Sequence, residues 1–495
     1  MRHSIPDLPP GWAWAPLGDL GDFINGRAFK PTDWKDKGRL IIRIQNLTGS
    51  TNERHYFDGP IEEKHIVHSG DVLVSWSATL DAFVWSGPES ILNQHIFKVR
   101  PFVDKMFLYY LIKSSILKLK GQVHGTGMQH ITKGRFDSTP VPLPPLPEQR
   151  RIVIKIEKLL QELRTANRSL QEVPALAKRF RQSVLTKAFR GELTERDPKD
   201  EPAELVLGRI EQRKKAEWES ESKRQHSSNN EKPRFSAIRE ELGKIPDGWA
   251  WTTLSRLAEV KGGVAKGRRF PGRRTVKAPY LRVANVQSGY LDLTTVKEID
   301  VLPEEVDEYQ LRSGDILFTE GGDRDKLGRG TVWHNEVPKC VHQNHIFRAR
   351  LKTKDVLPEY ISLISQSLFG RDYFSSVASQ TVNLASINIT NLRSFPIPLA
   401  PTGEQVRVVA KIGQLLALAD RVKESAEAGV NSTETLAHSI LARAFRGELV
   451  PQDPNDEPAS ILLERIRAQR AAMGKKKVRR KLEEFASPAA ITPKV

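Results

Sequence analysis

A glycine-rich basic stretch in the second half of the chain has the composition of a phosphate-binding loop. Residues 261–274 read KGGVAKGRRFPGRR and place six cations among flexible glycines. Lysine and arginine neutralise phosphate oxygens, and glycine lets a backbone approach a phosphate chain closely. We therefore predict contact with a nucleic-acid backbone, while a solvated basic loop remains the alternative. The six candidates are Lys261, Lys266, Arg268, Arg269, Arg273 and Arg274.

Three segments in the first half of the chain and two further segments in the second half carry polar or basic residues at matching places. The basic stretch corresponds to residues 25–35, NGRAFKPTDWK. The segment SWSATLD corresponds to EGGDRDKLGRG, and HGTGMQHITKGR corresponds to QTVNLASINITN. Phosphate positioning needs cations, whereas base edges are read by amide, hydroxyl and cationic side chains. The candidates are Arg27, Lys30, Lys35, Ser75, Ser77, Gln129, His130, Lys133, Arg324, Lys326, Asn383 and Ser386.

Patterns typical of catalysis or metal binding are weak. Asp58, Glu62 and Lys64 imitate a nuclease pattern, but their spacing is short. Residues 334–345 contain four possible zinc ligands, of which only His345 has a counterpart in the first half. The chain lacks a G-x-x-x-x-G-K-[ST] loop and the Asn/Asp-Pro-Pro-Tyr/Phe tetrapeptide of amino-methyltransferases. We therefore expect no catalytic, cofactor-binding or metal site.

Composition favours a basic globular protein with an acidic partner. The 495 residues predict two to four domains, and a hydrophobic content of 39% is enough for globular cores. A formal net charge of +17 favours nucleic acid as partner, although a basic protein without such a partner would look similar. A single cysteine excludes an internal disulfide. Because no secretory signal or membrane span is recognisable, a cytoplasmic location is expected.

An internal repeat sets the arrangement of the elements that must position these residues. The hexapeptide AFRGEL occurs at residues 188–193 and 444–449, an offset of 256 (444 − 188). The same offset holds from Glu148 to Ile210 without insertion or deletion. Upstream of these segments the offset drifts, from 237 at the GWAW openings (249 − 12) to 250 at the NQHIF-like strands (343 − 93). This pattern predicts two globular blocks with one fold but different loops, each followed by a helical segment of fixed length.

Apolar residues after each block recur at alternating spacings of four and three. This heptad pattern predicts a long helix from about Pro147 and a second in the repeat. We expect an α+β protein in which two mixed α/β domains are joined by two long helices, packed as an antiparallel coiled coil with pseudo-two-fold symmetry. An amphipathic helix packed on a globular domain is the alternative. The predicted seam is Ile152, Ile156, Leu159, Leu163, Leu170, Val408, Ile412, Leu415 and Val422.

This layout resembles the specificity subunit of a type I restriction–modification complex. The resemblance rests on the PLPEQRRIV and APTGEQVRVV helix starts, AFRGEL followed by DPxDEPA, the GWAW openings and the NQHIF-like strands. It covers nearly the whole chain. Gly403 replaces Pro147 in the repeat, and Val430 stands opposite Pro174, so the pseudo-symmetry is imperfect.

The resemblance implies a non-catalytic subunit that gives an enzyme complex its DNA sequence specificity. Each globular block would be a target-recognition domain for one half of a split site in double-stranded DNA. The helices would set the gap and dock methyltransferase subunits, with two such subunits expected. Endonuclease-motor subunits would join through these, and S-adenosylmethionine, ATP and Mg²⁺ would be used by the other subunits. The implied domains are residues 1–146 and 245–402 for recognition, 147–212 and 403–470 for the helical spacers, 213–244 for a linker and 471–495 for a basic flexible tail.

Two other classes remain in competition. A free-standing DNA-modifying or cleaving enzyme would need a site that the repeat does not duplicate. A coiled-coil scaffold without a DNA role would leave the net charge of +17 and the glycine-arginine loops unexplained.

Overall fold

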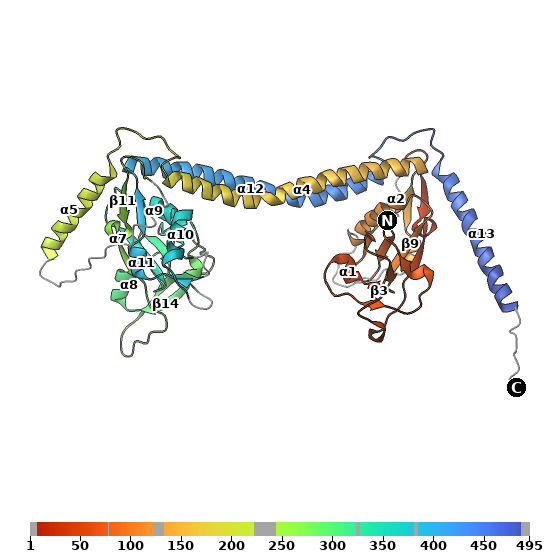
Figure 1. The fold of residues 1–495 in the computed structure, drawn as a ribbon, viewed down its shortest axis with the longest axis horizontal. Helices are drawn as coiled ribbons and strands as arrows, with labels where there is room; N and C mark the ends of the chain where they lie inside the picture. Colours follow the sequence, from red (N-terminus) through yellow and green to blue (C-terminus); the bar gives the residue numbers. More distant parts are fainter. Residues whose placement is uncertain are drawn as a thin grey trace. The chain divides into compact units, whose positions relative to one another are not determined.

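The structure, a computed structural model, consists of two compact units and describes residues 7–77, 79–121, 133–221, 244–322, 327–380 and 385–486. The first unit combines residues 1–171 with 427–495, and the second unit is residues 172–426. Each unit therefore contains one globular block and parts of both long helices (Figure 1). We call the blocks the first head (residues 1–146) and the second head (residues 245–402).

A four-stranded antiparallel sheet forms the centre of each head. Its strand order is β2-β9-β6-β7 in the first head and β12-β19-β15-β17 in the second. The register also agrees, because Val99 faces Phe23 in one head and Ala349 faces Val260 in the other. The two heads thus share a framework, as the drifting repeat predicted. These strands are β2 (Gly21–Asn25), β6 (Val72–Ser75), β7 (Asp81–Val84), β9 (Ile96–Pro101), β12 (Ala258–Gly262), β15 (Ile316–Thr319), β17 (Gly330–Val332) and β19 (Ile346–Leu351).

Smaller sheets complete each head. The order is β4-β3-β8-β5 in the first head, and β14-β13-β18 with β16-β21-β20 in the second. The strands are β3 (Arg39–Ile42), β4 (Tyr56–Phe57), β5 (Ile66–Val67), β8 (Ser90–Leu92), β13 (Val276–Leu281), β14 (Lys297–Val301), β16 (Gly321–Gly322), β18 (Val341–His342), β20 (Ser379–Gln380) and β21 (Ala385–Ser386). The helices are α1 (Ile44–Thr48), α2 (Lys105–Gly121), α3 (Lys133–Asp137), α7 (Leu254–Leu257), α8 (Pro303–Tyr309), α9 (Pro358–Gln366), α10 (Leu368–Val377) and α11 (Ile389–Arg393), with short 3-10 turns at 17–19, 31–33, 63–65 and 283–285.

The beginning and end of each head pair with each other as a two-stranded antiparallel sheet. In the first head β1 (Ala13–Pro16) pairs with β10 (Pro140–Leu143), so that Trp14 faces Pro142. In the second head β11 (Ala250–Thr253) pairs with β22 (Pro396–Leu399), so that Trp251 faces Pro398. The GWAW openings therefore lie beside the proline-rich segments that lead into the long helices.

Two long helices of nearly equal length follow the heads. They are α4 (Leu146–Phe189) and α12 (Thr402–Ala444), and α4 continues through Pro174. A shorter helix follows each of them in the chain: α5 (Ala203–Glu221) after α4 and α13 (Ala459–Ala486) after α12. Residues 213–221 of the predicted linker and 471–486 of the predicted tail are therefore helical.

The long helices run antiparallel. In the first unit Leu170 lies against Gly429, and in the second Arg181 donates to Asp420 at 3.2 Å. Higher-numbered residues of α4 thus face lower-numbered residues of α12.

The predicted seam is buried near the heads and departs from the heptad farther along α12. Ile152, Ile156, Val408 and Ile412 are buried, whereas Leu159, Leu163, Leu170 and Leu415 are partly buried. Val422 is 49% exposed, so its assignment to the seam is wrong. Between residues 406 and 427 of α12 the buried positions are instead 408, 412, 416, 419 and 426. Positions 412, 419 and 426 keep the seven-residue spacing of the heptad, whereas the position buried next to Leu415 is Leu416 and Val422 is exposed.

The end of each long helix completes the core of the head that belongs to the other repeat. In the second unit Val184 and Phe189 of α4 share a core with Tyr360 and other buried residues of the second head. In the first unit Leu441 and Phe445 of α12 share a core with the first head. The repeated AFRGEL segment is therefore a core element, exchanged between the two repeats.

Equivalent hydrogen bonds fix each head to the start of its helix. The indole N–H of Trp12 donates to Glu148 at 3.0 Å, and that of Trp249 donates to Glu404 at 2.8 Å. Both carboxylates are buried. Burial raises the pKa of Glu148 despite the hydrogen bond from Trp12. Because a buried acceptor without a donor is costly, each tryptophan is matched to its glutamate.

The helix starts are also tied to the repeated DPxDEPA segments. Arg151 of α4 donates to Asp456 at 2.7 Å in the first unit. Arg407 of α12 donates to Asp200 at 2.5 Å in the second unit. Both residues of each pair correspond at the offset of 256, so the same ion pair is made twice between opposite repeats.

Candidate nucleic-acid interface

The loops that carry the sequence-predicted residues meet at one edge of the central sheet in the first head. Asn25 at the end of β2 faces Phe97, and Ser75 at the end of β6 faces Ile96 and Asp81. The loops after β2 and β6 and the turn before β9 therefore leave the sheet at the same edge. Arg27, Lys30, Lys35 and Ser77 lie in these loops.

The second head presents the equivalent edge. Gly262 at the end of β12 faces Phe347, and Thr319 at the end of β15 faces Ile346. The loops that leave here are the basic stretch and the segment after β15. Ser386, which is exposed, pairs across β16 with Gly321 and so joins this edge. Among the residues that the structure describes, both heads thus bring predicted residues to the same place on the same framework.

Ser75 does not fit its predicted role. Its side chain is fully buried, and its hydroxyl donates to the Thr79 and Asp81 carbonyls while accepting from the Asp81 N–H. These bonds close the β6–β7 turn and satisfy the hydroxyl within the protein. Ser75 therefore shapes the loop, and Ser77 is the partly exposed serine of this segment.

The cations of the first head differ in how firmly they are held. The Arg27 guanidinium lies 4.6 Å from the Phe57 ring centre and 5.1 Å from that of Phe29. Lys30 and Lys35 are exposed. Lys133 donates to Asp137 at 3.0 Å. Gln129, His130, Arg324, Lys326 and Asn383 lie outside the described residues.

The six cations of the basic stretch fall into two sets. Lys261, Arg268 and Arg273 form ion pairs with glutamates of α8. The other three, Lys266, Arg269 and Arg274, are exposed. Within the residues described, no carboxylate pairs with these three.

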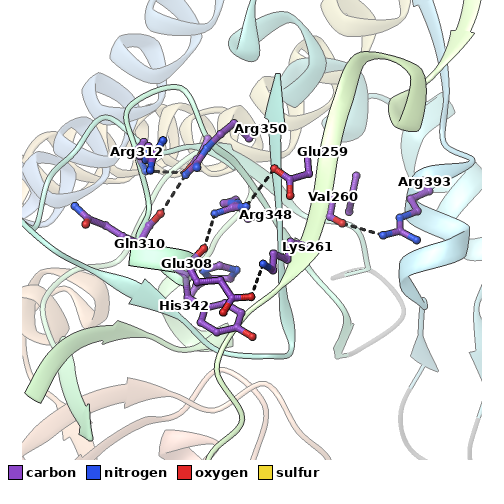
Figure 2. A network of polar contacts seen from close by, with 12 residues as sticks. Glu259, Val260, Lys261, Glu308, Gln310, Arg312, His342, Arg348, Arg350 and Arg393 are labelled. Atoms are coloured by element: carbon purple, nitrogen blue, oxygen red, sulfur yellow. Dashed lines mark hydrogen bonds and ion pairs between the residues drawn. The ribbon is translucent and has the colours of Figure 1, made fainter. Parts of the chain in front are cut away.

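A buried cationic cluster beneath this edge was missed from the sequence. Figure 2 shows Lys261 and Arg348 directed at Glu308, and Arg350 directed at Gln310. Arg348 is only 2% exposed, and burial lowers its pKa. Arg350 makes two 2.7 Å bonds to the Asp315 carboxylate. A signal existed in IFRARL, because alternation of apolar and basic residues predicts a strand with two different faces.

His342 lies inside this cluster. Its Nδ1 is 3.1 Å from the Tyr309 carbonyl, and its side chain is fully buried. Burial, with a contribution from Arg348, lowers the pKa of His342 to about 4. In the first head Lys98 and Arg100 occupy the matching strand positions, where they donate to the Ile66 carbonyl and to Asp22. The positive charge at the base of the edge is thus common to both heads.

The residues considered for catalysis do not assemble into a site. Glu62 pairs with Lys64 at 2.7 Å on the surface. Burial raises the pKa of the Cys340 thiol to about 12, so this thiol is protonated at neutral pH. No group of three or more possible metal ligands occurs in the part of the chain that the structure describes. Over those same residues, no helix is both long and apolar enough to span a bilayer.

Comparison with known proteins gives the chain a family. A family model described as "Type I restriction modification DNA specificity domain" matches residues 9–175 and 246–428. The chain belongs to the specificity subunits of type I restriction–modification systems. It is therefore the non-catalytic subunit of such an enzyme, as the resemblance implied.

Relatives of this specificity subunit match it over almost their full length. The EcoKI specificity subunit of Escherichia coli K12 is 27% identical over 518 residues, covering 97% of this chain and 99% of that protein. The EcoBI specificity subunit of Escherichia coli is 27% identical and covers 97% and 96%. The HsdS subunit from Thermoanaerobacter tengcongensis has a TM-score of 0.57 at 19% identity, covering 90% of this chain and 100% of that one. This structural likeness supports the α+β fold.

Proposed function

We propose that each head reads one half of a split DNA site and that the long helices set the unread gap. The observation that carries this proposal is the shared sheet edge. Strand order and register agree between the heads, yet the loops that leave the edge differ in length and charge. A common framework with unlike loops suits two domains that bind the same kind of ligand with different sequence preferences.

The proposed contacts divide by chemistry. Cations at the edge neutralise phosphates and fix the position of each head, whereas amide, hydroxyl and imidazole groups reach the base edges. We assign phosphate contacts to Arg27, Lys30, Lys35 and Lys133 in the first head, and to cations of the basic stretch together with Arg324 and Lys326 in the second. Base contacts are assigned to Ser77, Gln129, His130, Asn383 and Ser386.

The spacer role rests on the constant length of the helical repeats. Insertions accumulate in the heads. By contrast, the segment from Glu148 to Ile210 has the same length as its counterpart in the second repeat. The Trp–Glu bonds fix each head to the start of its helix, and the Arg–Asp pairs fix each helix start to the opposite repeat. A rigid joint and a fixed helix length are what a constant gap requires.

Exposed apolar side chains on the helices support docking of partner subunits. Phe180 and Leu436 correspond at the offset of 256 and are 41% and 50% exposed. Leu205 and Ile461 correspond in the same way and are 55% and 44% exposed. Large apolar groups exposed at matched positions favour a protein partner. We therefore propose that one methyltransferase subunit docks at Phe180 and Leu205, and another at Leu436 and Ile461.

Matching hollows lie beside the exchanged phenylalanines. One of about 200 Å³ is lined by Phe189 and Leu368 in the second unit. Another of about 400 Å³ is lined by Phe445 and Ser115 in the first unit.

In the proposed complex the endonuclease-motor subunits join through the methyltransferases, and S-adenosylmethionine, ATP and Mg²⁺ are used by those subunits.

The test is to map modified bases. The chain is expressed with its methyltransferase subunit in cells that lack other DNA methylation, and methylated adenines are located across the genome. We expect one split motif with a fixed gap, and exchange of the first head should change one half-site only. An ungapped motif, or methylation that persists without this chain, would contradict the proposal. A coiled-coil scaffold would give no salt-dependent DNA binding.

A further inference from the structure

An acidic helix lies against the basic stretch of the second head. Helix α8 contributes three glutamates, and each pairs with one cation of the stretch. Glu308 Oε1 is 2.5 Å from Lys261 Nζ, and Glu304 Oε1 is 2.6 Å from Arg273 Nη2. Arg268 makes two parallel bonds to Glu305, of 2.5 and 2.9 Å. The loop is therefore attached to α8 at three points.

The pair between Arg268 and Glu305 is the best sheltered of the three. Its side chains are 33% and 12% exposed, compared with 59% and 61% for Arg273 and Glu304. The hydrogen bond from Arg268 lowers the pKa of Glu305. Glu305 also accepts from the Leu302 N–H at 2.9 Å, which caps its own helix. A two-bond arginine–carboxylate pair fixes direction as well as distance, so it orients the loop.

Helix α8 is itself tied to the central sheet. Arg348 of β19 donates to the Glu308 carbonyl at 3.3 Å, near the C-terminal end of α8. Arg350 of β19 donates to the Gln310 carbonyl at 3.1 Å (Figure 2). Arg350 is also fixed by Asp315. The connection thus runs from the sheet through α8 to the loop, and the buried cluster described above gives α8 a firm base.

The three cations without an ion pair to a described residue alternate with the paired ones along the loop. Arg269 follows paired Arg268, and Arg274 follows paired Arg273. Each of Arg269 and Arg274 therefore lies next in sequence to a cation that α8 holds, while neither forms an ion pair with a described residue.

We propose that α8 is a positioning element that divides the six cations into anchors and phosphate contacts. This inference rests on the proposed DNA-reading function. Lys261, Arg268 and Arg273 are anchors, and the groups that touch the DNA backbone are Lys266, Arg269 and Arg274. The partner at this surface is the sugar–phosphate chain of the half-site read by the second head.

The competing idea makes the opposite prediction. If the α8 glutamates occupied cations that DNA also needs, neutralising them would strengthen DNA binding. If α8 positions the loop, neutralising the same glutamates weakens binding although negative charge is removed.

Anchoring is tested without DNA by limited trypsin digestion of the chain assembled with its methyltransferase subunits. The variant Glu304→Gln/Glu308→Gln is compared with Glu298→Gln/Asp300→Asn, two exposed acids of β14 in the same head. Both variants change the charge equally. We expect cleavage within residues 261–274 to become about fourfold faster in the first variant only, the effect of losing two exposed ion pairs. Equal cleavage in both variants would overturn the anchoring role.

Phosphate contact is tested by the salt dependence of binding to the mapped site. Lys266→Ala/Arg269→Ala/Arg274→Ala should reduce the slope of log K against log salt by about 2.7, close to 0.9 for each contact. Exchanging the charges of Arg273 and Glu304 should leave the slope unchanged, because an anchor works in either polarity. An unchanged slope in the triple variant, or tighter binding by Glu304→Gln/Glu308→Gln, would overturn the inference. If the wild-type complex bound no DNA, the proposed function itself would fail, while the trypsin result would still decide the role of α8.

Discussion

Truncation of Phe445 should destabilise the first head, although the two are far apart in the chain. Phe445 is 3% exposed, and its ring lies 5.6 Å from that of Phe107 at an angle of 64°. The two residues are separated by 338 positions (445 − 107). If the end of α12 completes the core of the first head, Phe445→Ala opens a cavity there. The equivalent change in the second unit is Phe189→Ala, whose ring lies 5.5 Å from Tyr360.

The expected loss of stability follows from the burial of Phe445. Replacing a fully buried phenylalanine by alanine costs about 3–5 kcal/mol, which includes the residual cavity. The loss of the edge-to-face contact with Phe107 is part of that cost. We expect the first unit to lose about 4 kcal/mol of unfolding free energy. At 1.4 kcal/mol per tenfold change, its most protected amides should exchange roughly a thousandfold faster.

Hydrogen exchange measured by mass spectrometry on the intact chain locates the effect. In Phe445→Ala, exchange should accelerate in strands β2, β6 and β9, while the second head keeps its protection. Phe189→Ala should give the reverse pattern. Leu436→Ala is the matched control, because Leu436 lies on the same helix but is 50% exposed. If Phe445→Ala accelerated exchange in the second head, or in neither head, the exchanged-core argument would be refuted.

Three other predictions follow from the joint, the buried histidine and the helices. Trp249→Phe should cost the second unit about 1–3 kcal/mol by denaturant titration, because the Glu404 carboxylate, 1% exposed, loses its donor; no loss would mean that this bond is dispensable. His342 has a folded pKa of about 4 against 6.5 when unfolded, so protonation favours the unfolded state and stability falls as pH drops through this window. Between pH 7 and 5 wild type should lose about 2 kcal/mol relative to His342→Gln, and parallel pH profiles would contradict this. Four residues added at facing points of α4 and α12 lengthen them by about 6 Å, which should widen the mapped gap by one or two base pairs, and an unchanged gap would reject the spacer role.

The contacts at the helix starts also explain why the repeated motifs contain more residues than helix formation requires. EQ at each helix start places a buried glutamate beneath the indole of GWAW, and DPxDEPA supplies the aspartate for an arginine of the opposite repeat. A helix would form without these residues. Their spacing reflects contacts that hold a head, a helix start and the opposite repeat together.

Much of the fold could be predicted from local patterns. The constant offset of 256 predicted helices of matched length, and α4 and α12 span Leu146–Phe189 and Thr402–Ala444. The drifting offset predicted two heads with one framework, and their central sheets share order and register. Both predictions hold because helices and strands form from sequence patterns between residues close together in the chain. The same local pattern occurs in both copies of the repeat.

The candidate site was less predictable, because burial and ion pairing depend on distant partners. Ser75 has the composition of a polar loop residue, but its turn buries it. Val422 fits a heptad, but it is 49% exposed. The partners of Arg268 and Arg273 lie 37 and 31 positions away on α8, so composition alone showed a uniformly basic stretch.

The sequence by itself determined that there are two like units, equal helices and a basic edge, because these are properties of repetition, periodicity and charge. Only the tertiary structure decided that each AFRGEL segment completes the head of the opposite repeat, and which cations are anchored. From a repeated sequence alone, each helix end could pack on the head of its own repeat or on that of the other repeat. Both arrangements bury the same apolar residues. The antiparallel course of α4 and α12 settles the matter by carrying the end of each helix to the head where the other begins.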